Sequence, residues 1–319
     1  MKTIEWNLLV VGYLFLGGLS AGIFFVSALA TLIRKKDNPD LNRIAVLGAR
    51  LAPWPVILGC TLLMFDLGRW YRFYKLFLHI RWTSPMSIGS WLLMVFILIS
   101  FLCLYASLST EQRTRLISLL PRFVRFHWIE NFDLSEQRRT LAIIGLPVSV
   151  GVGIYTGVLL GAVQSRPFWN TSLVAQLFLF SAMSTGCAAL LFVLLLGRKP
   201  IAATELRLLY TLDIAALTLE LFIVLPYIIH GQLSVQAVRD SLQLILGGPF
   251  TLAFWLLFFS LGLLLPLLME IWEVVSAHLS GTIGYHGKWI ATSTAILVLA
   301  GGFLLRYIFV YAGQISAFR

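Results

Sequence analysis

The sequence predicts an all-α integral membrane protein with eight transmembrane helices. Its 319 residues are 59% hydrophobic and only 12% charged, and their mean hydropathy is +0.89. A helix needs about 20 mainly apolar residues to cross a bilayer, and runs of that length recur along the chain. The connections between the runs leave no length for a soluble domain. Residues 1–319 are therefore expected to form a single membrane domain.

The eight expected spans follow one another along the chain. Five contain no charged residue: Trp6–Ile33, Trp82–Leu108, Thr140–Ser165, Pro167–Gly197 and Ser241–Met269. Three more carry a few charges: Leu51–Leu67, Leu208–His230 and Trp289–Tyr311. The first run is read as a retained helix, because it is too long for a signal peptide and its basic cluster follows it. Glu270 and Glu273 are expected to close the seventh helix at the inner face, where they are solvated.

An internal repeat divides the helices into two halves. Residues 14–22 (LFLGGLSAG) and 178–186 (FLFSAMSTG) share a pattern of apolar and small residues that ends in Ser, a small residue and Gly. Four helices precede the second copy, so both halves have the same orientation. This predicts two four-helix bundles, 6–165 and 167–315, related by a pseudo-two-fold axis along the membrane normal. Small residues at every fourth position from Gly145 to Gly161 predict close packing of helices 1 and 4.

The positive charge lies mostly on one side of the predicted membrane. One set of connections carries 15 of the 24 Lys and Arg residues, the other set with the termini carries 8, and Arg306 is inside a span. The positive-inside rule then places both termini outside, in the periplasm of a bacterial inner membrane. Because the charge follows membrane sidedness, the net charge of +10 does not indicate nucleic-acid binding.

The second connection is an exception to this charge bias. It lies on the outer side yet is basic, with Arg69, Arg72, Lys75 and Arg81. Of these, Arg72, Lys75 and Arg81 are the candidate residues for docking an acidic partner. The alternative is that the segment forms only an exposed amphipathic turn.

Cysteine and histidine usage narrows the cofactor chemistry. Cys60, Cys103 and Cys187 lie singly within apolar spans and no C-x-x-C pair occurs, so neither a metal site nor an iron–sulfur cluster is supported. Four of the five histidines fall in connections and His230 is at a helix end, whereas a membrane haem needs paired histidines within spans. No nucleotide-binding or hydrolase motif occurs. We expect no haem, metal or cluster in this chain.

Polar side chains from several helices share the outer half of the membrane. At 1.5 Å per residue, Tyr13 lies roughly 10 Å and Tyr155 about 15 Å below the outer face. Asp66 and Arg69 end helix 2 at that boundary, and Arg306 is about 8 Å deep. Such phenols, carboxylate and guanidiniums could hydrogen-bond a quinone head group and exchange its protons. The alternatives are interfacial tyrosine anchors, a helix-end ion pair and a snorkelling arginine.

Helix 6 carries two acids on one face. Asp213 and Glu220 are seven residues apart, and Glu220 is near the midplane, where an unpaired carboxylate is costly. One interpretation is a proton relay from the inside toward the outer-half residues Asp66 and Arg306. The other is a neutral acid or an ion pair that joins two helices.

Several motifs together resemble one known family. They are Leu67-Gly68-Arg69 after an acid, Thr83-Ser84-Pro85-Met86-Ser87-Ile88-Gly89, Gly18-Leu19-Ser20-Ala21-Gly22, Tyr155-Thr156-Gly157 and Tyr311-Ala312-Gly313-Gln314. In this order they resemble the NrfD/PsrC (polysulfide reductase NrfD-type) family of quinone-interacting integral membrane subunits. The resemblance covers essentially the whole chain.

This resemblance implies a function and partners. Family members exchange electrons between a membrane quinone and a periplasmic ferredoxin-like iron–sulfur subunit, which serves a catalytic or cytochrome subunit. The resemblance implies menaquinone or ubiquinone as substrate, bound in the outer half. Tyr155 matches the family's helix 4 tyrosine, and Tyr13 takes the place of a hydrogen-bonding residue that is often not tyrosine. The rival functions are a secondary transporter, for which broken helices would be expected, and a passive membrane anchor.

Overall fold

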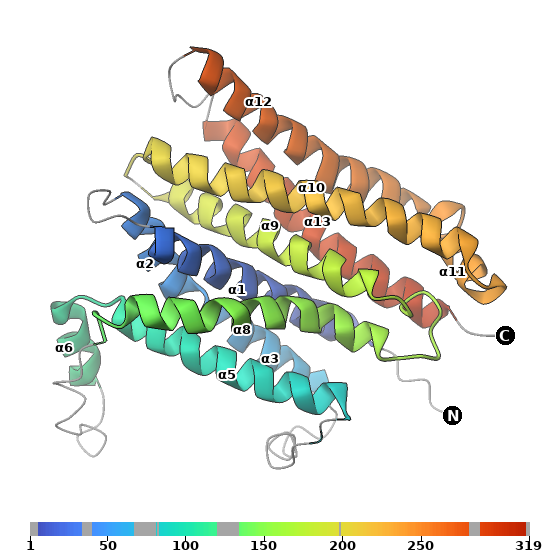
Figure 1. Ribbon diagram of the computed structural model, residues 1–319, viewed down its shortest axis with the longest axis horizontal. Coiled ribbons are helices and arrows are strands. Elements are labelled where there is room, and N and C mark those ends of the chain that lie inside the picture. The colour runs from blue at the N-terminus through green and yellow to red at the C-terminus, as the bar shows by residue number, and fades with distance from the viewer. Residues whose placement is uncertain are drawn as a thin grey trace.

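The structure is a computed structural model that describes residues 6–33, 40–66, 81, 83–119, 134–197, 199–280 and 288–316. Its helices run roughly side by side (Figure 1). They are α1 (Leu8–Ile33), α2 (Asp40–Leu51), α3 (Pro53–Asp66), α5 (Pro85–Ala106), α6 (Thr110–Leu119), α8 (Arg138–Gly161), α9 (Leu173–Leu196), α10 (Ala203–Leu233), α11 (Gln236–Leu246), the π-helix η2 (Ala253–Leu264), α12 (Leu265–Ser280) and α13 (Lys288–Ile315). No strand occurs among these residues.

Eight spans can be identified within the described residues, which confirms the predicted number. Six consist of one helix each, α2 and α3 together form the second span, and η2 and α12 together form the seventh. The start of α1 and the end of α13 lie at the same face, at the right of Figure 1. We call it the terminal face, and the other the opposite face.

Two predicted spans have different bounds in the structure. The second starts at Leu41 rather than Leu51, because the polar helix α2 continues the apolar helix α3. Pro53 and Pro55 begin α3 and cannot donate backbone hydrogen bonds to the preceding turn. The Ser20 hydroxyl of α1 instead donates to the Ala52 carbonyl oxygen at this break.

The seventh span was also predicted too early in the chain. It runs from Ala253 to Leu279 rather than from Ser241 to Met269. The segment Gly247-Gly248-Pro249 ends α11, so Ser241 belongs to a separate short helix at the terminal face (Figure 1). The span therefore reaches ten residues beyond Met269.

Helices α1 and α9 lie at the centre of the molecule and cross at two glycines. A Cβ atom on Gly22 would overlap the backbone of Ala182, and one on Gly186 would overlap the backbone of Gly22. Gly22 and Gly186 are equivalent positions of the sequence repeat. Their contact is the one that a two-fold axis between α1 and α9 requires, while the two-bundle symmetry itself stays a prediction.

The glycines of α8 allow close packing on two neighbouring helices. α8 packs extensively on α1, as predicted for helices 1 and 4, and the Phe24 ring of α1 fills the space beside Gly145. Farther along, Gly153 lies against Leu179, and Gly157 lies against the backbone of Ala175 in α9. The glycine stripe therefore also serves the contact with α9.

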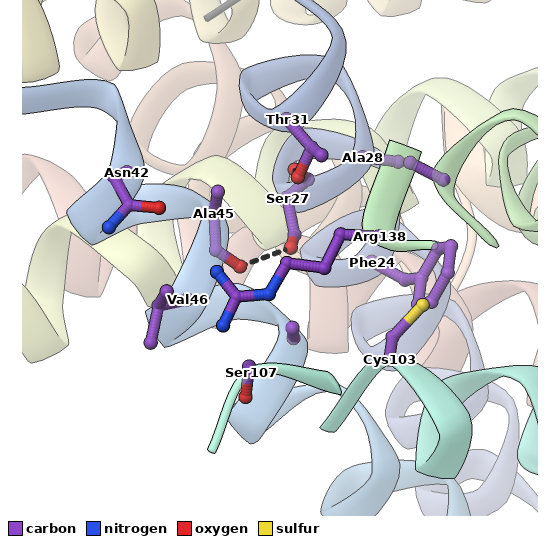
Figure 2. Close-up of a pocket in the computed structure, with 12 residues that line it drawn as sticks. Phe24, Ser27, Ala28, Thr31, Asn42, Ala45, Val46, Cys103, Ser107 and Arg138 are labelled. Atoms are coloured by element: carbon purple, nitrogen blue, oxygen red, sulfur yellow. Dashed lines mark hydrogen bonds between the residues drawn. The ribbon is translucent and has the colours of Figure 1, made fainter. Parts of the chain in front are cut away.

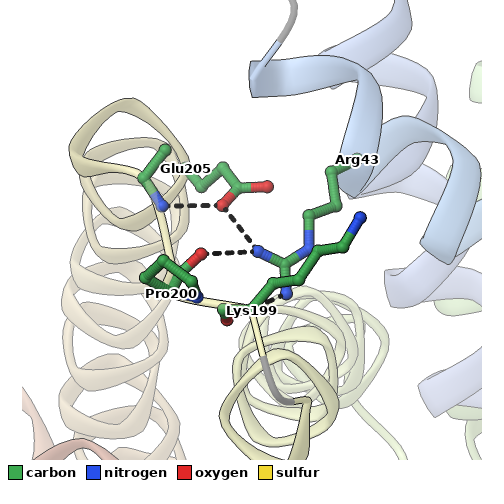
Figure 3. A network of polar contacts seen from close by, with 5 residues as sticks. Arg43, Lys199, Pro200 and Glu205 are labelled. Carbon is green, nitrogen blue, oxygen red and sulfur yellow. Dashed lines mark hydrogen bonds and ion pairs between the residues drawn. The ribbon is translucent and has the colours of Figure 1, made fainter.

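A polar network joins the two halves at the opposite face (Figure 3). Arg43 of α2 donates to the Pro200 carbonyl oxygen at 2.8 Å and pairs with Glu205 Oε2 of α10 at 3.5 Å. The same carboxylate oxygen accepts the Ala202 amide at the start of α10, at 2.8 Å. Glu205 is only 1% exposed, so these donors stabilise a charge that is removed from water.

Candidate functional site

Two tyrosines from different helices meet near the terminal face. Tyr13 lies five residues after the start of α1, and Tyr155 lies six residues before the end of α8. Both phenols are thus about 8–9 Å inside the helix ends. Tyr13 is 1% exposed and Tyr155 is 7% exposed, and the two phenol groups interact with each other. The structure therefore brings together two residues that were selected both by their depth and by the family resemblance.

The helices around this pair fit closely because glycines face the tyrosines. Gly89 of α5 lies directly against the Tyr155 ring, so a Cβ atom there would overlap the ring. Gly59 of α3 faces the Tyr13 backbone, with its ideal Cβ position 3.3 Å from the Tyr13 carbonyl oxygen. Gly89 is the glycine that closes the Thr83–Gly89 motif. That motif thus supplies the space in which Tyr155 is held.

Asp66 lies at the terminal-face end of the same helices. It is the last residue of α3, and its side chain interacts with that of Asn7, just before α1. Asp66 is therefore farther out than Tyr13. The neighbouring Arg69, together with the predicted docking residues Arg72 and Lys75, lies outside the described residues.

Of the predicted docking residues, only Arg81 is described. Its side chain is exposed, and its backbone amide donates to Ser87 Oγ at 3.0 Å. Ser87 belongs to the first turn of α5 and is buried. This contact fixes the end of the second connection beside the Thr83–Gly89 motif.

Arg306 lies inside the protein rather than at a lipid-facing surface. It is 0% exposed, and its guanidinium donates to Ser181 Oγ at 2.9 Å and to the Gly302 carbonyl oxygen at 2.7 Å. It also lies over the Phe15 and Phe178 rings, 5.8 and 5.2 Å from their centroids. The snorkelling alternative therefore does not describe this residue.

Arg306 forms a cluster with Glu220 that is distinct from the tyrosine pair. Glu220 of α10 is 3% exposed and interacts with Ser181 and with the charge of Arg306. Ser181 of α9 is thus shared by an arginine and a carboxyl group. On α1, Phe15 and Gly18 face Arg306 while Tyr13 faces Tyr155, so the two groups lie on different sides of α1.

The carboxyl group of Asp213 lies beside that of Glu270. Asp213 of α10 is 2% exposed and interacts with Ser184 and with Glu270 of α12. Glu270 is 1% and Glu273 is 6% exposed, so the prediction that both are solvated at the inner face was wrong. The reason is that α12 continues to Ser280, which places Glu270 well inside the helix. The length of the apolar and amphipathic pattern after Met269 was the signal for this burial.

The opposite face contains a small cavity between α1, α2, α5 and α8, with both polar and apolar lining (Figure 2). It measures about 30 Å³, which is enough for one or two water molecules. Ser27, Thr31, Asn42, Ser107 and Arg138 line its polar part. The Ser27 hydroxyl donates to the Ala45 carbonyl oxygen of α2 at 2.7 Å. This cavity lies far from the tyrosine pair along the helices.

The described part of the chain contains no cluster of side chains that could bind a metal ion. No three His, Cys, Asp or Glu side chains come together there as a metal site requires. The three cysteines are free and separate.

Comparisons with known proteins identify the family of this chain. The model of the family described as polysulphide reductase, NrfD matches residues 1–317. The chain is similar to protein NrfD of Escherichia coli, with 30% identity over 99% of this chain and 96% of that protein. It is equally similar to a polysulfide reductase subunit of Wolinella succinogenes, with 30% identity over 98% of this chain and 95% of that protein.

A more distant relative comes from an archaeon. The Hdr-like menaquinol oxidoreductase integral membrane subunit of Archaeoglobus fulgidus is 25% identical over 98% of this chain and 71% of its own length. The family match and both 30% identities extend over nearly the whole chain. This chain therefore belongs to the polysulphide reductase NrfD family of integral membrane proteins.

Proposed function

We propose that this chain is the quinone-binding membrane subunit of a respiratory oxidoreductase complex. Its relatives include a subunit of a polysulfide reductase and a subunit of a menaquinol oxidoreductase. Such a subunit exchanges electrons between the membrane quinone pool and a partner protein. The single observation that carries the proposal is the contact of Tyr13 with Tyr155 near the terminal face.

The tyrosine pair suits a quinone head group by its chemistry. Menaquinone and ubiquinone carry two carbonyl oxygens, and a buried phenol can donate a hydrogen bond to either one. Tyr13 and Tyr155 are held between α1, α3, α5 and α8, which fixes the direction of both hydroxyl groups. Asp66, farther out, would take up or return protons, and Arg69 is proposed to act beside it.

When bound, the quinol supplies two electrons and two protons, or the quinone accepts them in the reverse direction. The protein's own residues then have separate roles. Tyr13 and Tyr155 orient the head group, and Asp66 transfers protons at the terminal face. Asp213, Glu220 and Arg306 form the proposed proton connection through the second bundle. Their burial and their shared contacts with Ser181, Ser184 and Glu270 support this role.

The terminal face is proposed to face the periplasm of a bacterial inner membrane. The bias of 15 against 8 basic residues supports this orientation. A ferredoxin-like iron–sulfur subunit would dock there, against Arg72, Lys75 and Arg81, and would pass electrons to or from a catalytic or cytochrome subunit. The contact of the Arg81 amide with Ser87 supports this site. It connects Arg81 to α5, the helix whose Gly89 lies against the Tyr155 ring.

The decisive experiment measures oxidation of a short-chain naphthoquinol by the assembled complex. Tyr155→Phe removes one hydroxyl and is expected to slow turnover by up to about tenfold, the value of one hydrogen bond. Asp66→Asn removes a proton acceptor and is expected to slow it about a hundredfold. Glu220→Gln is expected to slow turnover while quinone binding remains.

The matched control is Tyr307→Phe in α13, which removes a hydroxyl group from a tyrosine whose ring packs, tilted, against the Tyr311 ring. This variant should oxidise the quinol at the wild-type rate. Full activity in both Tyr155→Phe and Asp66→Asn would show that the chain is only an anchor for its partners.

A secondary transporter remains the second candidate because of one observation. The break between α2 and α3 and the π-helix η2 interrupt two spans, and transporters commonly bind their substrates at such interrupted helices. Solute uptake by liposomes that contain only this chain distinguishes the two functions. Uptake with no quinol oxidation in the assembled complex would replace the present proposal.

A further inference from the structure

A cleft at the opposite face combines two exposed lysines with an apolar wall. It measures about 380 Å³ and is lined by Leu194, Leu195, Gly197, Lys199, Pro200, Ile201 and Lys288. It lies between the end of α9, the turn that leads into α10 and the start of α13. None of the residues proposed for quinone binding or proton transfer lines it.

The two lysines present free positive charge to this cleft. Both side chains are exposed, and neither ammonium group has an ion-pair partner in the part of the chain that is described. Glu205 does not neutralise them directly, because its carboxylate is paired with Arg43 (Figure 3). Arg43 also donates to the Lys199 carbonyl oxygen at 3.4 Å, which holds the turn in place. The cleft therefore suits an anion.

The position of the cleft identifies the source of that anion. Lys199 follows the last residue of α9 by three positions, and Lys288 is the first residue of α13, so both lie at the boundary of the membrane. Leu196, at the end of α9, is 70% exposed, and Trp289, next to Lys288, is 88% exposed. Exposed tryptophan and leucine at this depth face lipid head groups and acyl chains. A soluble anion would gain nothing from these apolar contacts.

We propose that this cleft binds the head group of an anionic phospholipid such as phosphatidylglycerol. Lys199 and Lys288 contact the phosphate group from two sides, and Leu194, Leu195 and Ile201 contact the glycerol and the first methylene groups. Basic pockets between transmembrane helices are a known means of selecting anionic lipids. The bound lipid joins α9 to α13 at the face opposite to the tyrosine pair. This inference does not depend on the proposed function.

Native mass spectrometry of the full-length chain in detergent tests the proposal. The protein is titrated with phosphatidylglycerol or with phosphatidylethanolamine of the same acyl chains. Wild-type protein should prefer phosphatidylglycerol, and Lys199→Gln with Lys288→Gln should weaken that binding by about fivefold for each lysine removed. Binding of phosphatidylethanolamine should change little.

Two further variants keep the result interpretable. Lys199→Arg with Lys288→Arg retains the charge and should retain the preference, which excludes a folding defect as the cause. Arg139→Gln removes an exposed charge at the same face on α8, away from the cleft, and should behave as wild type.

Three results would overturn the proposal. Equal binding of the two lipids by wild-type protein would exclude selection of anionic head groups. An equal loss in Arg139→Gln would show that general surface charge is responsible. Displacement of the lipid by millimolar inorganic phosphate would assign the cleft to a free anion instead.

Discussion

Gly89 is the residue through which α5 controls the position of Tyr155. Because the ring occupies the space beside Gly89, a methyl group at this position must push the ring aside. We expect Gly89→Ala to lower the free energy of unfolding by about 1–3 kcal/mol, as overpacking does. We also expect it to separate Tyr155 from Tyr13. The result should be slower quinol oxidation in the assembled complex, with all eight spans still inserted.

The control for this substitution lies on α8. The ideal Cβ position of Gly151 is 3.4 Å from the nearest atom, Leu92 Cδ1, which is an ordinary contact. Gly151→Ala should therefore leave the rate of quinol oxidation unchanged. A wild-type rate in Gly89→Ala would contradict the role assigned to the glycine.

Burial of single residues was the hardest property to read from the sequence. Tyr13 was expected roughly 10 Å deep and lies about 8 Å inside the end of α1. Tyr155 was expected about 15 Å deep but lies only about 9 Å inside the end of α8, because α8 ends at Gly161 rather than at Ser165. The partners of Arg306 could not be predicted, since Ser181 and Glu220 come from helices that are far away in sequence. Glu270 was misplaced because its burial depends on where α12 ends.

At the scale of elements, the crossing of α1 and α9 depends on Gly22. A Cβ atom there would overlap a backbone carbonyl group of α9, and a backbone cannot rotate away as a side chain can. We expect Gly22→Ala to lower the free energy of unfolding by about 1–3 kcal/mol, measured by SDS titration in mixed micelles. Gly161→Ala is the control, because its ideal Cβ position is 3.6 Å from the nearest atom. Equal stability of the two variants would show that α1 and α9 can separate without cost.

The sequence predicts the bounds of a span well where a long apolar run determines them. It predicts them less well where contacts between distant residues determine them. Six spans of single helices were found close to their predicted positions, because burial in lipid demands long apolar runs. Helix α2 was missed as part of a span because Asn42, Arg43 and Arg50 make it look like a connection. Arg43 forms an ion pair with Glu205, and Arg50 donates a hydrogen bond to the Ser107 carbonyl oxygen at 2.9 Å. These contacts cannot be seen in the sequence.

At the scale of the whole molecule, the fold is compatible with either orientation in the membrane. The distribution of Lys and Arg residues is the evidence for which face is periplasmic. The start of α1, the end of α3, the start of α5 and the end of α13 share the terminal face (Figure 1). The tyrosine pair lies near this face, so the orientation decides on which side of the membrane electrons leave or enter. The lysine cleft lies at the other face, so it contacts the cytoplasmic leaflet only if the terminal face is periplasmic.

Reporter fusions in a bacterial host test this orientation. Alkaline phosphatase folds only in the periplasm, so a fusion after the C-terminal residue Arg319 is expected to be active, while green fluorescent protein at the same site is expected to be dark. A fusion in the turn after α9, at Lys199, should give the reverse pattern, because it lies one span away from the terminal face. If fluorescence instead appears at Arg319, the tyrosine pair lies near the cytoplasm. The iron–sulfur partner would then have to dock on that side, and the basic second connection could not be its periplasmic docking surface.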